Sequence, residues 1–174
     1  AAPQLWILGS SLYGAQLAAM LGLPYAFASH FAPDHLDAAL RMYRERFTPS
    51  ATLDKPYCIA AINVIAAPTD EEAVLLASSM DQSFVRLRSG NPGKLPPPVP
   101  GFRDTLPPQA EAMLAHMRQV SAIGSPATVR DRLEAFQERT QADELIVSGS
   151  TFDPALRRRS LELTMEAVSG LVAA

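Results

Sequence analysis

Apolar and polar residues alternate in blocks along this chain, and the blocks have two different periods. Four apolar runs have the length and density of buried strands, namely residues 5–8, 22–28, 57–67 and 143–149. Between them, apolar residues recur every three or four positions, which is typical of amphipathic helices. The predicted helices are residues 11–21, 34–47, 69–87, 109–120 and 126–140, with a last one from Pro154 to the C-terminus. Buried strands that alternate with helices predict an α/β fold with a parallel sheet and right-handed crossovers.

Short polar motifs mark where several of these helices begin. Thr69 followed three residues later by Glu72 forms a capping box, and Asp34 and Asp153 are expected to cap the helices that follow them. These positions support the boundaries that the apolar periodicity predicts.

Residues 90–108 break the alternation. They hold seven of the fifteen prolines, which predicts an extended segment with polyproline character. The segment is too long for a routine connection, so it is read as an insertion. It is either a lid over the active site, where Lys94 and Arg103 could reach an anionic ligand, or an exposed insertion without that role.

Composition narrows the class of protein. A chain of 174 residues, 48% of them hydrophobic, suits a single domain over residues 1–174. The net charge of −3 and the scattered basic residues give no electrostatic surface for nucleic acid, and no apolar run approaches the roughly 20 residues of a membrane span. The only cysteine, Cys58, lies in an apolar run and is predicted to be a buried thiol. Without an internal disulfide, a reducing cytoplasm is the expected compartment.

Three short polar segments follow predicted strands. Because ligands of parallel sheets bind at the carboxyl ends of the strands, these segments are candidate site residues. They are Gly9-Ser10-Ser11, Ser29-His30-Phe31 and Gly149-Ser150-Thr151. The first is either a tight turn in which a serine caps the next helix, or a phosphate site made by free N–H groups, hydroxyls and the helix dipole.

His30 is the candidate catalytic residue, since an imidazole at a strand end could bind a ligand or transfer a proton. The alternative is a loop histidine bonded to the backbone. Phe31 and Ser150 are candidate substrate-pocket residues. The spacing of His30 and His35 does not place both on one helix face, so no metal site is expected.

Several stretches of the chain resemble the luciferase-like flavin-dependent monooxygenases, the bacterial luciferase superfamily. They are "WILGSSLYGAQLAAMLGLPYAFASHFAP", "YRERFTPS", "KPYCIAAINVIAAPTDEEA" and "GSPATVRDRLEAF" with "ADELIVSG". The resemblance implies a TIM (β/α)8 barrel, of which only about the last four strands would be present here. A full barrel takes ~250 residues. The chain is therefore expected to be the C-terminal half, with a proline-rich insertion at residues 90–108.

The same resemblance implies an activity. Reduced FMN, supplied by a separate flavin reductase, would react with O2 to oxygenate a small organic substrate, and the turn of Gly9, Ser10 and Ser11 would hold the FMN phosphate. The expected partners are the missing N-terminal half or a second copy of the chain. Two other functions stay open, a deazaflavin-dependent oxidoreductase of the same superfamily and a flavin-binding or structural domain without catalysis.

Overall fold

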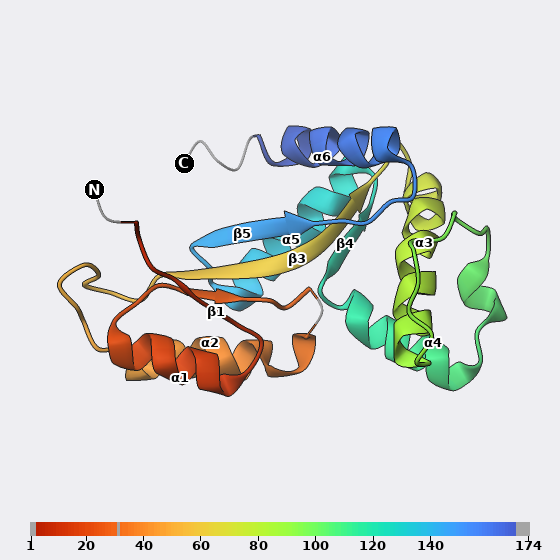
Figure 1. Ribbon diagram of the computed structural model, residues 1–174. Helices are drawn as coiled ribbons and strands as arrows, with labels where there is room; N and C mark the ends of the chain where they lie inside the picture. The colour runs from red at the N-terminus through yellow and green to blue at the C-terminus, as the bar shows by residue number, and fades with distance from the viewer. Residues whose placement is uncertain (1–2, 31, 170–174) are drawn as a thin grey trace. The chain divides into compact units, whose positions relative to one another are not determined.

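The computed structural model describes residues 3–30 and 32–169 of the chain (Figure 1). In this part the strands are β1 (Ile7–Gly9), β2 (Tyr25–Phe27), β3 (Cys58–Ala66), β4 (Ser121–Gly124) and β5 (Glu144–Ser148). The α-helices are α1 (Leu12–Leu21), α2 (Leu36–Arg46), α3 (Asp70–Arg88), α4 (Pro108–Arg118), α5 (Pro126–Thr140) and α6 (Pro154–Val168), and the 3₁₀ helices are η1 (Pro33–His35) and η2 (Phe102–Thr105). The chain forms two compact units, residues 1–62 with 136–147 and residues 63–135 with 148–174.

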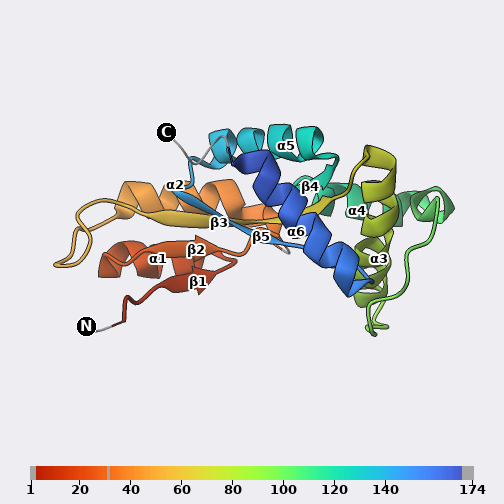
Figure 2. The ribbon, with the colours of Figure 1, turned by 90° about the horizontal axis from the view of Figure 1, so that it is seen from above.

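The first unit is built on parallel strand pairs. β1 pairs with β2 in the register that sets Gly9 opposite Phe27, and β2 pairs with β3 in the register that sets Tyr25 opposite Cys58. β5 also pairs with β3. The helices α1 and α2 pack side by side and contact these strands (Figure 1), while Figure 2 shows β1 and β2 running next to each other. The predicted parallel α/β arrangement is thus confirmed.

Small side chains let α1 pack closely. Ala15, Ala18 and Ala19 are completely buried, as their spacing predicts. The helix ends at Gly22, whose φ of 61° lies in the left-handed region and which has the Thr48 carbonyl oxygen only 2.5 Å from where a Cβ would be. Only glycine fits this position without strain, so the chain leaves the helix here.

Arg44 fastens residues 136–147 to the rest of the first unit. It lies in the last turn of α2, and its Nη2 donates hydrogen bonds of 2.7 Å to the carbonyl oxygens of Thr140 and Gln141 at the C-terminus of α5. Those carbonyls carry the negative end of the helix dipole, which a guanidinium complements. Beside it, Cys58 donates its N–H to Asp143 Oδ2 at 2.7 Å, and the Asp143 N–H donates to the Cys58 carbonyl at 2.9 Å. Cys58 is buried, as predicted, and burial raises the pKa of its thiol.

In the second unit, residues 63–66 of β3 pair in parallel with β4, and α3 packs against β4. The buried Ser160 of α6 accepts the Ala66 N–H at 2.8 Å, which attaches α6 to the end of β3. The Thr69 half of the predicted capping box is confirmed, because its Oγ1 accepts the Glu72 N–H at 3.2 Å. Asp153 caps α6 as predicted, because its Oδ1 accepts the Ala155 N–H at 2.7 Å.

The N-terminus of α5 is held by a carboxylate from another helix. Asp70 Oδ1, in the first turn of α3, accepts the Ser125 N–H at 2.6 Å. That bond, together with the Ser125 and Thr128 hydroxyls, holds the pKa of Asp70 below its ordinary value. The preceding Gly124 has a φ of 158°, and a Cβ there would lie 2.6 Å from Asp70 Oδ1. Because glycine has no Cβ, the Asp70 carboxylate fits into this space.

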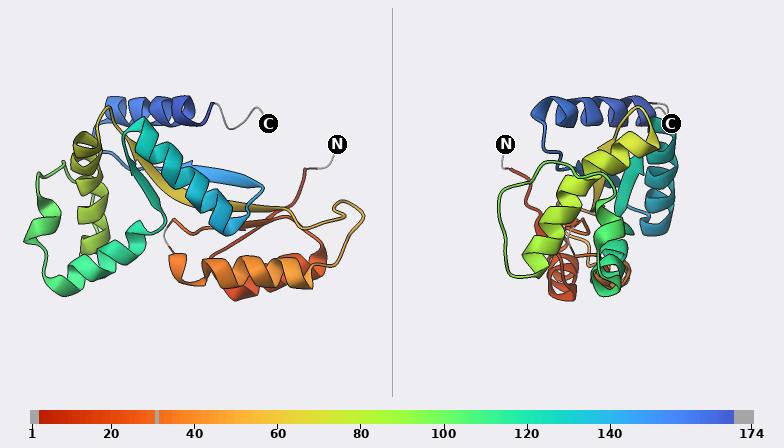
Figure 3. Two further views of the ribbon diagram at one scale, coloured as in Figure 1. Left: turned by 180° about the vertical axis from the view of Figure 1, so that it is seen from behind. Right: turned by 90° about the vertical axis from the view of Figure 1, so that its right-hand side faces the viewer.

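The proline-rich segment runs beside α3 (Figure 3). The Val99 N–H donates to Ser78 Oγ at 2.8 Å, and Gln82 Nε2 donates to the Pro97 carbonyl at 2.9 Å. Both α3 residues are buried. Arg103 forms an ion pair with Glu111 of α4. The segment is thus anchored within its own unit, and its role as a lid stays a prediction.

Two local predictions were wrong. The strand β4 was not predicted, since it has only four residues and exists through its pairing with β3. Asp34 does not cap α2, because Pro33 starts the short helix η1 and α2 begins only at Leu36. The last residues of the predicted C-terminal helix, 170–174, lie outside the described part. The single-domain half-barrel stays a prediction.

We expect Arg44→Ala to lower the free energy of unfolding by about 2 kcal/mol, because two helix-terminal carbonyls lose a charged donor. Urea unfolding followed by far-UV circular dichroism measures this. Arg41→Ala, an exposed position on the same helix, is the matched control. Equal stability of the two variants would contradict the role of Arg44.

We expect Asp70→Asn to lower the melting temperature at pH 7, because asparagine keeps an acceptor oxygen but loses the charge at the α5 N-terminus. A carboxyl whose pKa is lowered by folding stabilises the folded state above its unfolded pKa, and this contribution disappears as the pH falls through the lowered folded pKa. Thermal scans from pH 7 down to pH 2 should therefore show the two proteins converging. Glu72→Gln, which changes a charge in the same turn, should give a smaller difference.

Candidate functional site

The turn between β1 and α1 has a defined support. β1 ends at Gly9, and Ser11 is the N-cap residue of α1 with extended backbone angles, φ −141° and ψ 166°. The Tyr25 hydroxyl donates to the Ser11 carbonyl oxygen at 3.3 Å. Gly9 and Gly14 both lie against the Tyr25 side chain, since a Cβ on either would be in van der Waals contact with it at 3.5 Å. Burial raises the pKa of Tyr25 to about 12, and its hydroxyl therefore remains a donor.

The N-terminus of α1 lacks the side-chain caps that α3 and α6 have, and also the acidic first-turn residues found in α2 and α4, which likewise begin without a side-chain cap. The Ser11 side chain makes no capping hydrogen bond, and the first turn contains no acidic residue. The first turn of α3, by contrast, has the Thr69 cap and acidic side chains, and α6 has its Asp153 cap. The prediction of a side-chain cap is thus wrong for Ser11. Free N–H groups, a positive helix end and an exposed hydroxyl fit an anionic group at this position.

The second predicted segment lies at the same end of the first unit. The Ala28 N–H donates to the Gly9 carbonyl at 2.9 Å, which holds the ends of β1 and β2 together. Ser29 is completely buried, and its hydroxyl donates to the Ala61 carbonyl. His30 follows and is half-buried, and desolvation lowers the pKa of its imidazole. Phe31 lies outside the described residues.

The third segment belongs to the second unit. Ser150 is exposed after β5. A Cβ on the preceding Gly149 would overlap the Val64 carbonyl oxygen, so the backbone passes very close to β3 there. Thr151 Oγ1 donates to the Asp153 carbonyl at 3.3 Å. The hydroxyl of Thr151 therefore serves the turn that leads into α6.

Sequence reasoning missed Tyr25, which supports the turn of residues 9–11 from the next strand. In the sequence, Tyr25 is one residue of an apolar run and carries no sign of a polar role. Only the parallel register of β1 and β2 places its hydroxyl under the turn. The described residues contain no group of three His, Cys, Asp or Glu side chains that could share a metal ion. Among the same residues, no helix has the length and apolar character to cross a membrane.

Comparison with known proteins gives the same family from sequence and from structure. The family model described as luciferase-like monooxygenase matches residues 1–143. A protein of Escherichia coli strain K12 named luciferase-like monooxygenase is 48% identical over 161 residues, which are 92% of this chain and 48% of that protein. The chain thus spans about half the length of this curated relative.

Several solved structures align over nearly the whole chain. The crystal structure of apo-MsnO8 superposes with a TM-score of 0.80 and 32% identity, over 97% of this chain and 52% of that one. Two more distant structures share the fold. They are the oxygenating constituent of 3,6-diketocamphane monooxygenase from Pseudomonas putida in complex with FMN (TM-score 0.63, 23% identity, 97% and 49% of the chains) and a coenzyme F420-dependent tetrahydromethanopterin reductase from Methanopyrus kandleri (TM-score 0.59, 13% identity, 95% and 50%).

Three observations agree on the family. They are the match of the family model over most of the sequence, the parallel strand pairs and the superposition on apo-MsnO8. The chain belongs to the luciferase-like monooxygenase family.

Proposed function

We propose that this chain is part of a flavin-dependent monooxygenase that uses reduced FMN and O2 to oxygenate a small organic substrate. Family membership supports the reaction class. The observation that supports a flavin site in this chain is the uncapped N-terminus of α1, with Ser10 and Ser11 beside it.

In this proposal the turn of Gly9, Ser10 and Ser11 holds the FMN phosphate. The N–H groups of the first turn of α1 donate to the phosphate oxygens, and the serine hydroxyls add further donors. The Tyr25 hydroxyl fixes the Ser11 carbonyl, which orients the turn before the cofactor arrives. Bound reduced FMN, delivered by a separate flavin reductase, supplies the electrons that activate O2.

His30 is the proposed residue for hydrogen bonding or proton transfer. Its lowered pKa keeps the imidazole neutral at pH 7, so a ring nitrogen is able to accept a proton from a ligand. Phe31 and Ser150 are the proposed pocket residues for the substrate. A reducing cytoplasm, expected from the single cysteine, is part of the same proposal.

We further propose that the site is completed by the N-terminal half of a longer protein or by a second copy of this chain. Within the described residues β1 is at the end of the strand order and pairs with β2 alone. Leu5 and Leu8 beside this open edge are 67% and 72% exposed. An unpaired strand edge with apolar neighbours favours pairing with another strand.

Two alternative functions remain, one with a different cofactor and one without catalysis. The F420-dependent reductase shares the fold, which keeps a deazaflavin-dependent oxidoreductase as the second candidate. A flavin-binding or structural domain without catalysis is the third. Oxygenated product formed with reduced FMN and O2 supports the first function. Product formed only with reduced deazaflavin supports the second, and tight flavin binding without turnover by either cofactor supports the third.

The phosphate site is tested by comparing FMN with riboflavin, which lacks the phosphate. We expect the purified protein to bind FMN at least tenfold more tightly, and Ser10→Ala with Ser11→Ala to remove most of that difference, because phosphate donors are lost while the isoalloxazine contacts remain. Fluorescence quenching of each flavin measures the two dissociation constants.

Ser89→Ala provides the control for this pair. Ser89 is an exposed serine at the end of α3, and its loss should leave the ratio of FMN to riboflavin affinity unchanged. Equal affinity of the unaltered protein for FMN and riboflavin would refute the phosphate site.

A further inference from the structure

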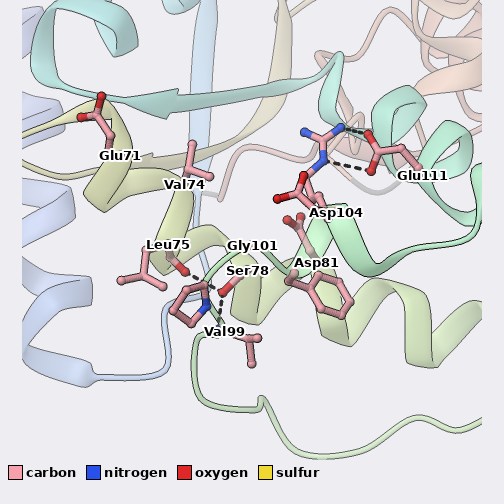
Figure 4. A pocket seen from close by; sticks show the side chains of 12 residues that line it. Glu71, Val74, Leu75, Ser78, Asp81, Val99, Gly101, Asp104 and Glu111 are labelled. Carbon is pink, nitrogen blue, oxygen red and sulfur yellow. Dashed lines mark hydrogen bonds and ion pairs between the residues drawn. The ribbon is translucent and has the colours of Figure 1, made fainter.

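The second unit contains a cavity that the proposed flavin site does not use. Its volume is about 590 Å³, within the range of small-molecule sites. One wall is a single face of α3, and the opposite wall is the end of the proline-rich segment with η2 and the first turns of α4 (Figure 4). None of its lining residues belongs to the turn of residues 9–11 or to the segment around His30.

The position of the proline-rich segment defines this cavity. Ser78 lies on the cavity wall, where its Oγ donates to the Leu75 carbonyl at 2.6 Å and accepts the Val99 N–H at 2.8 Å. The serine therefore joins the two walls. The buried Ser78 hydroxyl thus holds the proline-rich segment at a fixed distance from α3, and the space between the two forms the cavity.

The middle of the cavity is apolar. Val74 and Leu75 face it from α3, and Val99, Pro100 and Phe102 line it from the other wall. Val74 is 52% exposed and Val99 is 39% exposed, so neither is covered by its own chain. A ligand with a hydrocarbon or aromatic body would cover these surfaces.

The charged groups of the cavity leave negative charge in excess. Arg103 is paired with Glu111, to which its Nε donates at 3.1 Å, and Arg118 is paired with the buried Asp81, to which its Nε donates at 2.9 Å. Both guanidiniums are thus already satisfied by carboxylates. Asp104 also acts electrostatically on Arg103 but forms no ion pair within the described residues, and it is exposed at the same end of the cavity, near Asp81 and Glu111 (Figure 4).

At the other end, Glu71 adds a second exposed carboxylate (Figure 4). The cavity lining thus contains four acidic residues and one basic residue. When Arg118, which pairs with Asp81 from outside the lining, is also counted, two negative charges remain in excess. This potential repels phosphates and carboxylates and attracts cations. The cavity is therefore unsuited to the phosphate of a flavin.

We infer that this cavity binds a small organic ammonium compound, whose apolar body lies between α3 and the proline-rich segment and whose cationic group lies beside Asp104. The apolar walls account for the hydrocarbon part of the ligand, and the surplus carboxylates account for its charge. The inference concerns a site separate from the proposed flavin site and does not depend on it.

Three probes of similar size separate charge from shape, namely 2-phenylethylammonium, 2-phenylethanol and 3-phenylpropionate. Titrations of the purified protein at pH 7 and low salt, followed by ¹⁵N NMR shifts of the backbone, measure each dissociation constant. We expect saturable binding of the ammonium, with an affinity about tenfold above that of the carboxylate and about threefold above that of the alcohol. The shifts should centre on residues 74–81 and 99–104.

Variants assign the effect to this cavity. Glu71→Gln with Asp104→Asn should remove the preference for the ammonium while 2-phenylethanol binds as before. Glu72→Gln is the matched control, because Glu72 is an exposed acid of the same helical turn outside the cavity lining. Val74→Trp should weaken all three probes by filling the apolar part. The inference is overturned if the ammonium does not saturate, if the carboxylate binds as well, or if Glu72→Gln removes the preference equally.

Discussion

The backbone pairing of β3 is the constraint on which both units depend. Seven of its residues are paired in these registers, three with β2 and four with β4, and its residues are almost all buried and apolar. In the first unit, residues 58–60 pair with β2, and in the second unit, residues 63–66 pair with β4. In each unit, the neighbouring strand is therefore positioned by the part of β3 that it pairs with, since a parallel register fixes both the position and the direction of that strand.

The ends of helices in this chain are satisfied by different means. The C-terminus of α5 receives Arg44, its N-terminus receives Asp70, and α6 has the local cap Asp153. These helices have their terminal groups bonded within the chain. α1 begins without a side-chain cap, as α2 and α4 also do, although in α1 a serine occupies the position. An unsatisfied helix N-terminus beside a turn held by Tyr25 is the feature that an anionic cofactor group would complete.

The proline-rich segment has a structural role that its composition does not reveal. Prolines limit its unfolded alternatives, which lowers the entropy that is lost when the segment orders. Ser78 then accepts the Val99 N–H and Gln82 donates to the Pro97 carbonyl, so two backbone groups of the segment are bonded to α3. The result is a second wall for a cavity, in which every arginine is neutralised by a neighbouring carboxylate. Charge and shape therefore assign this cavity a different ligand from the one proposed for α1.

The sequence by itself determined the features that depend on neighbouring residues. The apolar periods predicted the parallel α/β elements, the capping motifs predicted Thr69 and Asp153, and the quoted stretches led to the family. Tertiary structure alone decided the short strand β4 and the contacts of Arg44 with α5 and of Asp70 with Ser125. These contacts join residues 55 to 97 positions apart in the chain. The pattern of neighbouring residues does not indicate which distant backbone group a side chain will contact. It also decided that Ser11 takes the cap position without capping, because the rotamer of one hydroxyl depends on its surroundings and not on its spacing.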